Sequence, residues 1–327
     1  MLLEILRRRS CAAATVALAA AALATPAPCD PASEAPVEAT SLLGQPLARP
    51  ALESEFEKRQ RELLAAAEAQ LERRPDDVDS WIWVGRRLGY LARYREAIAH
   101  YSAALARFPD DPRLLRHRGH RYISVRHLDE ATNDLRRAAD RLASRSDEVE
   151  PDGLPNQAGV PTSTLQSNVW YHLGLTHYLS GRYDQAADAY RECLRFSTNS
   201  DMRVATTYWL YLTLERLGRS EEAARELAPI YPEMHLFENH SYHRLLLAAQ
   251  GKTGLDELLA TARSEQGTIG FPTTAYGVAT LTAIHGDVER AERLLREIVD
   301  TAPQWSAFGY IAAEADLARD DGEPTAR

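Results

Sequence analysis

Residues 78–109, VDSWIWVGRRLGYLARYREAIAHYSAALARFP, carry a spacing of bulky and small side chains that returns 34 residues further along the chain, from Trp81 to Leu115. The same spacing recurs at Leu115, Gly119 and Ala131, and at Trp170, Gly174 and Ala186. It recurs in degenerate form at Leu210, Leu214 and Ala223, and at Val278, Ala279, Ala291 and Pro303. A fixed period of this length is typical of repeat architectures, in which each unit buries its apolar face only against its neighbours.

Each period has the composition of two helices joined by a tight turn. A bulky residue such as Trp81 opens the first helix, and a small one such as Gly85 follows where the two helices approach most closely. Ala97 is small again early in the second helix, and Pro109 ends that helix because its ring would clash with the preceding turn. The pattern predicts an all-α fold, a right-handed solenoid of about six to seven stacked antiparallel helix pairs.

The repeated positions resemble those of the tetratricopeptide repeat (TPR), whose 34-residue pattern runs W, LG, Y, A, F, P. The resemblance is strongest over residues 78–142, 167–200 and 272–303. It implies a TPR solenoid with a concave inner groove, where ligands of such proteins usually bind.

Three further segments are similar to those of a group of exported bacterial TPR proteins: RHRGHRY at 116–122, EPDGLPN at 150–156 and ENHSYH at 238–243. This resemblance covers most of residues 78–250. It implies the fold and export only.

Residues 1–24 predict a secretory signal. Three arginines at 7–9 precede a run of 14 small and apolar residues at 11–24, which ends in Ala-Leu-Ala. This order is typical of export signals, and the run is too short for a membrane-spanning helix, which needs about 20 residues. We therefore expect an exported protein in the periplasm or the cell envelope.

Cys29 leaves a lipid anchor open as an alternative to soluble export. Pro26 and Pro28 occupy the places where the bacterial lipobox has Leu and a small residue, so the match is incomplete. We expect no structural disulfide, because Cys11 leaves with the signal and Cys193 falls inside a predicted helix.

The remaining chain divides by composition. Residues 25–50 are Pro-punctuated and predict a flexible linker. Residues 51–319 form the predicted solenoid, interrupted by an acidic insertion at 144–165, and residues 320–327 predict a frayed tail.

The charge balance excludes one class of partner. The 327 residues carry 38 Lys+Arg against 47 Asp+Glu, a formal charge of −9. Neutralising phosphates requires clustered excess base, so we expect no nucleic-acid partner. The sequence also has no Ser/His/Asp order, P-loop, dinucleotide-binding turn or metalloprotease motif.

The repeat frame predicts which side chains line the groove, because the second, fifth, sixth and ninth residues of each unit face inward. The predicted ligand-binding residues are Arg86, Arg113, Arg116, His117, His120, Asn168, Tyr171, His172, Tyr208, Trp209, His240, His243 and Arg244. Arginine beside aromatic rings suits an anionic ligand, so a protein or peptide partner with an acidic segment is expected. Each group has an alternative to ligand binding. The arginines could instead be solvated or paired with neighbouring acids, and Tyr171 and Trp209 could belong partly to the core.

Histidine spacing raises the question of a metal. His117 and His120 share one helix face, as do His240 and His243, but the two pairs are three units apart and neither has a carboxylate at metalloprotease spacing. We expect no metal and no cofactor.

Two hypotheses for function follow. The first is an exported interaction scaffold that holds an acidic partner segment in its groove. The second is a small-molecule or enzymatic site built from the groove arginines and histidines. The 144–165 insertion would cover this region as a lid over His117 and His120, or would be a flexible acidic loop.

Overall fold

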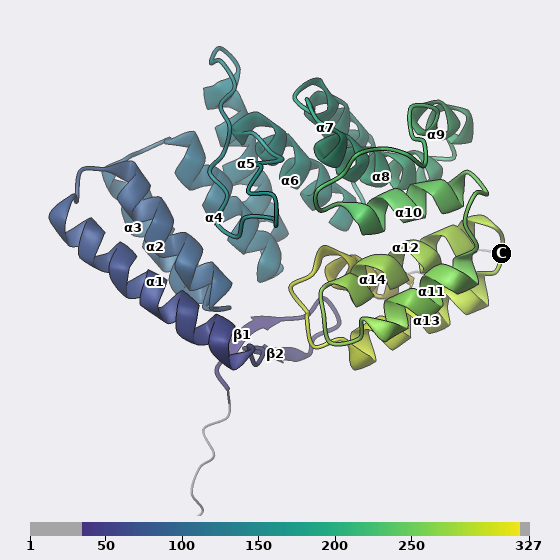
Figure 1. The fold of residues 1–327 in the computed structure, drawn as a ribbon, viewed down its shortest axis with the longest axis horizontal. Helices are drawn as coiled ribbons and strands as arrows, with labels where there is room; N and C mark the ends of the chain where they lie inside the picture. The colour runs from purple at the N-terminus through teal and green to yellow at the C-terminus, as the bar shows by residue number, and fades with distance from the viewer. Residues whose placement is uncertain (1–34, 321–327) are drawn as a thin grey trace, which may run out of the picture. The chain divides into compact units, whose positions relative to one another are not determined.

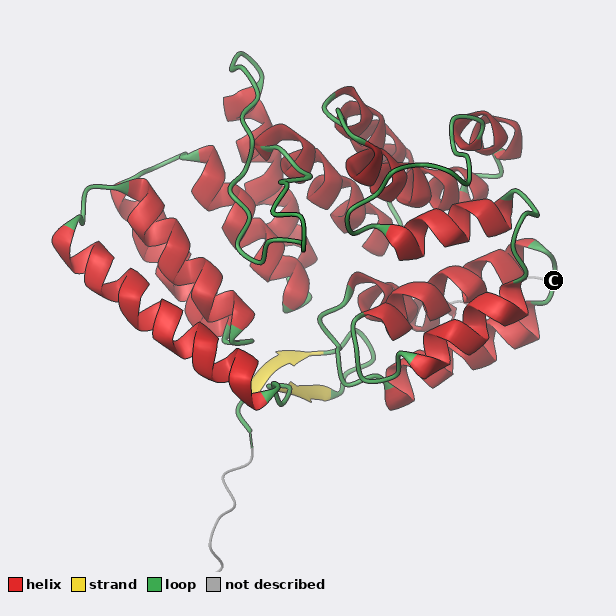
Figure 2. Ribbon diagram, in the orientation of Figure 1, coloured by secondary structure: helices red, strands yellow, loops and turns green. Residues whose placement is uncertain are grey.

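The computed structural model describes residues 35–320 (Figure 1), so the predicted signal, Cys29 and nearly all of the predicted tail lie outside the described residues. Within that range the chain is helical apart from one β-hairpin (Figure 2). In chain order the elements are β1 (Val37–Thr40), β2 (Pro46–Ala48), α1 (Ser54–Arg73), α2 (Val78–Tyr90), α3 (Tyr94–Arg107), α4 (Pro112–Ser124), α5 (Leu128–Leu142), α6 (Leu165–Leu179), α7 (Tyr183–Arg195), α8 (Ser200–Arg216), α9 (Ser220–Leu227), α10 (His240–Ala249), α11 (Leu255–Ser264), α12 (Gly270–Ile284), α13 (Val288–Thr301) and α14 (Phe308–Asp320).

Consecutive helices pack in pairs from α2/α3 to α12/α13, with α1 before the first pair and α14 after the last (Figure 1). Each first helix also packs on the first helix of the next unit along α2, α4, α6 and α8. This arrangement confirms the predicted all-α solenoid of stacked helix pairs.

Small residues lie where the two helices of a pair approach most closely, as the repeat pattern predicts. A Cβ atom at Gly85 would lie 2.3 Å from the Tyr101 ring, and one at Gly174 would lie 2.7 Å from the Tyr190 ring. Real Cβ atoms do not approach so closely, so a larger residue would force the helices of these pairs apart.

The turn inside each pair needs one residue with a left-handed backbone. The four later pairs use Gly181, Gly218, Gly251 and Gly286 there. The first two pairs use Ala92 and Arg126, with φ of 53° and 67°. A non-glycine residue in this region costs about 1–3 kcal/mol and persists only where its surroundings fix it.

The prediction of a flexible linker at 25–50 is wrong for its second part, because residues 37–48 form an antiparallel hairpin. Ala39 and Leu47 are buried in it, and the Glu38 carboxylate accepts hydrogen bonds from Arg49 Nε at 3.0 Å and from the Arg95 backbone N–H at 3.1 Å. Strands of four and three residues are too short to show alternation, so composition alone favoured a linker.

The hairpin and α14 meet at a buried ion pair. Arg126 donates from Nε to Glu314 Oε2 at 2.9 Å and from Nη2 to Glu314 Oε1 at 3.0 Å. The Leu42 backbone N–H also donates to Glu314, at 3.3 Å, and the Trp305 carbonyl accepts from Arg126 at 2.7 Å. Arg126 and Glu314, the closing pair, thus join the hairpin, the α4–α5 turn and the C-terminal helix.

Replacing Arg126 by methionine should lower the free energy of unfolding by about 3–5 kcal/mol, because the fully buried Glu314 carboxylate would lose its partner. Urea denaturation measures the effect. The control is Arg141→Met, which breaks an exposed pair with Asp110 and should cost less than about 1 kcal/mol. Equal losses in the two variants would show that the closing pair is not a stabilising contact.

Candidate functional site

Three consecutive first helices bring basic and polar side chains together. Arg86 extends from α2, Arg116 and His117 from α4, and Asn168 from α6, and all four surround the carboxylate of Glu150. We call these four residues the inner wall. Each was predicted from the repeat frame to face the groove, and the structure brings them to one place.

Glu150 comes from the 144–165 insertion and is buried, with 8% of its surface exposed. Its Oε2 lies 3.1 Å from Arg116 Nε and accepts from Asn168 Nδ2 at 3.1 Å. Its Oε1 lies 3.7 Å from His117 Nε2 and 4.0 Å from Arg86 Nη1. A buried carboxylate requires partners of this kind, because desolvation of an isolated charge costs several kcal/mol.

Hydrogen bonds fix the backbone of the loop as well as the Glu150 side chain. Arg86 Nη1 donates to the Pro151 carbonyl at 2.6 Å, and Arg87 Nη1 donates to the Gly153 carbonyl at 3.2 Å. Gly153 lies so close to α2 that a Cβ there would be 2.0 Å from the Tyr90 hydroxyl. The insertion thus lies against Arg86, Arg87 and His117 but not against His120, and the wall holds an acidic, non-helical segment.

The loop is fixed to the solenoid by polar contacts. Its two ends pair through the Glu150 backbone N–H to the Ser163 carbonyl at 3.2 Å and the Leu165 N–H to the Glu148 carbonyl at 2.9 Å. Its apolar side chains Val149 and Leu154 are exposed, at 62% and 46%. Little apolar burial therefore holds the loop, and its closure depends on charge and hydrogen bonding.

Burial has the largest effect on the pKa of the three histidines in and next to the inner wall. It lowers the pKa of His117 well below the usual histidine value, and the Arg116 and Arg86 charges lower it further. Burial likewise lowers the pKa of His120 and His172. All three rings are therefore neutral at pH 7, and the positive charge of the site comes from arginine alone.

The C-terminal helix covers the next part of the predicted groove. The His120 and His172 rings lie 4.4 Å apart, and the Phe308 ring of α14 lies 5.6 Å from His120 and 5.7 Å from His172. These two histidines are thus packed against the chain's own C-terminal helix. Sequence periodicity could not show this, because α14 lies outside the repeat pattern.

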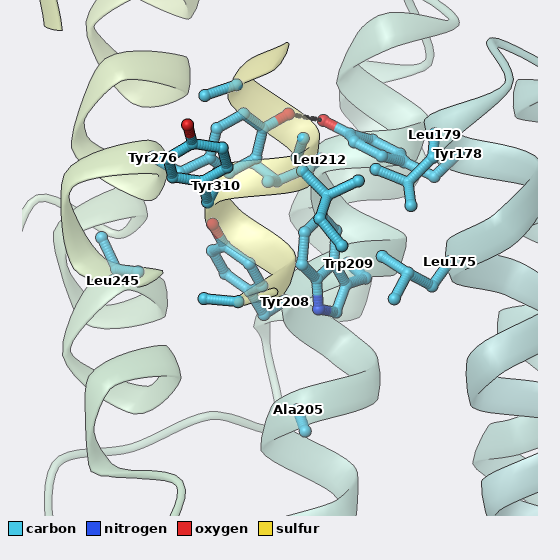
Figure 3. Close-up of a cluster of buried hydrophobic side chains, with 14 of the residues drawn as sticks. Leu175, Tyr178, Leu179, Ala205, Tyr208, Trp209, Leu212, Leu245, Tyr276 and Tyr310 are labelled. Carbon is cyan, nitrogen blue, oxygen red and sulfur yellow. Dashed lines mark hydrogen bonds between the residues drawn. The ribbon is translucent and has the colours of Figure 1, made fainter. Parts of the chain in front are cut away.

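The aromatic residues predicted to line the groove belong to the core, which corrects their assignment as ligand residues. Tyr208 and Trp209 are 2% and 1% exposed, and Figure 3 shows them packed among Leu175, Tyr178 and neighbouring side chains. Trp209 Nε1 donates to the buried Tyr171 hydroxyl at 2.8 Å. Their large apolar areas are buried where α6, α8, α10 and α12 meet, so no ligand can reach them.

The remaining predicted residues lie away from the inner wall. Arg113 pairs with Asp79 at 2.8 Å and Asp111 at 3.1 Å. His243 is buried, its Nε2 2.9 Å from the Tyr231 carbonyl, while His240 is exposed. Arg244 lies 4.0 Å from Glu265. For Arg113, the alternative of pairing with neighbouring acids describes the structure better than ligand binding.

Sequence reasoning missed Glu150, Arg87 and Arg121 as members of the site. Arg87 directly follows Arg86, and Arg121 directly follows His120. Neither position is one of the four that the repeat frame predicts to face the groove. Glu150 sits in a loop with no repeat register. Its only signal was the acidity of the insertion opposite a basic face.

Across residues 35–320, no group of three His, Cys, Asp or Glu side chains is placed to hold a metal ion. Nor is any helix of that range long and apolar enough to cross a bilayer.

Acidification should destabilise the fold through the buried histidines. A histidine whose pKa is lowered in the folded state binds a proton on unfolding, so stability falls as the pH drops below the unfolded value of about 6.5. Each such ring contributes a slope of up to about 1.4 kcal/mol per pH unit. Urea denaturation between pH 7.5 and 5.5 should show a shallower slope for His172→Gln and an unchanged slope for the exposed His285→Gln. Identical slopes for the two variants would contradict this.

Comparison with known proteins agrees with the repeat architecture. The profile of the family described as "Tetratricopeptide repeat" matches residues 167–200, which contain α6 and α7. No curated protein matches the chain.

Several solved structures are similar at low identity. MamA (AMB-1) is 20% identical and covers 54% of this chain and 90% of its own, with a TM-score of 0.40. YrrB, described as a TPR protein with an unusual peptide-binding site, is 15% identical, with 77% and 98% covered and a TM-score of 0.41. A TPR protein from Parabacteroides merdae ATCC 43184 is 12% identical, with 80% and 98% covered and a TM-score of 0.45. Residues 167–200 thus match a tetratricopeptide repeat, and the helix pairs that run from α2 to α13 have the same arrangement of paired helices.

Proposed function

We propose that this protein is an exported interaction scaffold whose inner wall binds an extended acidic segment of a partner protein. One observation carries the proposal: the chain's own acidic segment at 150–153 occupies the wall. Its carboxylate lies against Arg116 and Asn168, and its backbone carbonyls accept from Arg86 and Arg87. The loop occupies the wall as a partner segment would.

The contacts suit partner segments of varied sequence that share one acidic residue. Two of the arginine contacts go to backbone carbonyls, which every peptide offers, and one acidic side chain supplies the specific feature. Hydrogen bonds to charged groups contribute about 1.5–3 kcal/mol each, roughly twice a neutral one. One glutamate or aspartate at the position of Glu150 would therefore dominate recognition.

A partner segment would displace the 144–165 loop. The exposed Val149 and Leu154 show that the loop buries little apolar surface, so its release costs mainly polar contacts that the partner would replace. The available surface is the face of α2 and α4, because α14 covers the His120 and His172 rings.

Export supplies the proposed location. The arginines at 7–9 and the small apolar run at 11–24 form the proposed signal, and the partner would be a protein of the periplasm or envelope. Retention by a lipid at Cys29 is the alternative to a soluble mature protein.

A peptide with the loop sequence DEVEPDGLPN (147–156) should bind the protein carrying Glu150→Ala more tightly than the wild type, because the internal carboxylate no longer competes. The same peptide with Glu150→Gln should bind about tenfold more weakly or worse, since it lacks the charge-assisted contact. Fluorescence anisotropy with labelled peptides measures both affinities.

Glu148→Ala is the matched control protein for this experiment, because Glu148 is exposed in the same loop and its side chain does not reach the wall. It should bind the peptide like the wild type. Equal affinity for the glutamate and glutamine peptides would refute the proposed recognition.

Intact mass spectrometry of the protein from its native cells should show a chain beginning at Thr25 in the envelope or periplasmic fraction. A lipid anchor would instead give a chain beginning at Cys29 with an added acyl mass, which Cys29→Ser removes. An unprocessed chain in the cytosolic fraction would contradict export.

A further inference from the structure

A small cavity lies between α2 and α4, on the side of the arginines that Glu150 does not line. Its volume is about 110 Å³, and its polar lining comprises Arg86, Arg116, Arg121, His117, His120 and Tyr90. An apolar cavity of about 150 Å³ is known to hold a benzene-sized ligand. The space therefore accommodates a group of a few heavy atoms and excludes a nucleotide.

The cavity carries more positive charge than its surroundings neutralise. Arg116 is buried, and although Glu150 Oε2 lies 3.1 Å from its Nε, the N–H does not point at that oxygen and makes no hydrogen bond. The Arg121 guanidinium makes no hydrogen bond or ion pair to any residue in 35–320, and lies over the Tyr94 ring at 5.4 Å. Among the described residues, Glu150 is thus the one carboxylate near Arg86 and Arg116, and Arg121 has none. Cations clustered around a small cavity favour an anion.

The other lining groups present donors. The Tyr90 hydroxyl, which lies 3.3 Å from Arg86 Nη2 as an acceptor, keeps its own O–H for a further partner. The His120 ring makes no hydrogen bond within the described residues and is neutral, so it has one N–H available. Arginine N–H groups with hydroxyl and imidazole donors match the several acceptor oxygens of an oxyanion.

Two glycines of α2 create the space. A Cβ at Gly89 would lie 2.9 Å from Arg121 Nη1, and one at Gly85 would lie 2.3 Å from the Tyr101 ring. Gly85 belongs to the repeat pattern, but Gly89 has no glycine at the equivalent place one period on, where Ile123 stands. Gly89 therefore opens this unit toward Arg121 beyond what helix packing requires.

We propose that this cavity binds one compact oxyanion, either an inorganic tetrahedral anion such as phosphate or sulfate or a small carboxylate, held by Arg116 and Arg121. The cavity shares Arg86, Arg116 and His117 with the inner wall, but no residue of the 144–165 loop lines it, so the anion needs no displacement of Glu150. Binding would neutralise positive charge on Arg116 and Arg121 and fix α2 against α4.

Isothermal titration of the full mature chain with phosphate, sulfate and acetate, each at ionic strength matched with chloride, tests the proposal. We expect saturable binding of at least one anion and none of chloride, and the order of affinities tells a tetrahedral anion from a carboxylate. Arg121→Met should weaken binding about tenfold to hundredfold, and Arg121→Lys should recover part of it because the charge remains.

Arg137→Met is the matched control, because Arg137 pairs with Asp110 on the outer surface, and it should bind like the wild type. Circular dichroism shows that each variant is folded. If no anion binds more tightly than chloride, or if Arg121→Met and Arg137→Met bind equally, the proposal is wrong. No peptide is present, so failure here leaves the partner-binding proposal standing, and failure of the peptide experiment leaves this one standing.

Discussion

The closing pair of Arg126 and Glu314 is the constraint on which the rest of the structure depends. It joins residues 188 positions apart and satisfies both charges with further contacts from Ser124, Trp305 and Leu42. A buried pair of this kind is costly to break because the remaining charge would be stranded. It also explains why Arg126 keeps a left-handed backbone where later units have glycine: only a side chain at that place can reach α14.

Fixing α14 in this way divides the inner surface of the solenoid into two regions. Around α6, Phe308 packs on His172 and the groove is filled by the chain itself. Around α2 and α4 the surface stays open to a segment from outside the repeats, and the 144–165 loop takes it. Solenoid repeats usually bind along an extended concave face, whereas here only one short stretch of that face, within the described residues, is free of α14.

The repeat and its consequences could be predicted from the sequence, because they depend on contacts within about 34 residues. Gly85 against Tyr101 is such a contact, and so is the inward direction of Arg86 and Arg116. The hairpin and the contacts of α14 with Arg126 and His120 could not be predicted, since each depends on residues far apart in the chain. The repeat periodicity predicts which way a side chain points, but it does not predict which distant segment packs over that side chain.

Occupation of the inner wall by the 144–165 loop would lower the apparent affinity of any partner segment. A loop tethered at both ends competes with any partner at an effective concentration of order millimolar, whatever the partner's own concentration. The apparent dissociation constant of a partner is therefore its intrinsic constant divided by the small fraction of molecules with an open loop. Acidic peptides of low affinity would therefore not bind, and only a segment that competes successfully with Glu150 would occupy the wall. Under the proposed function, the loop would thus make a generally basic surface selective for segments that bind more tightly than Glu150.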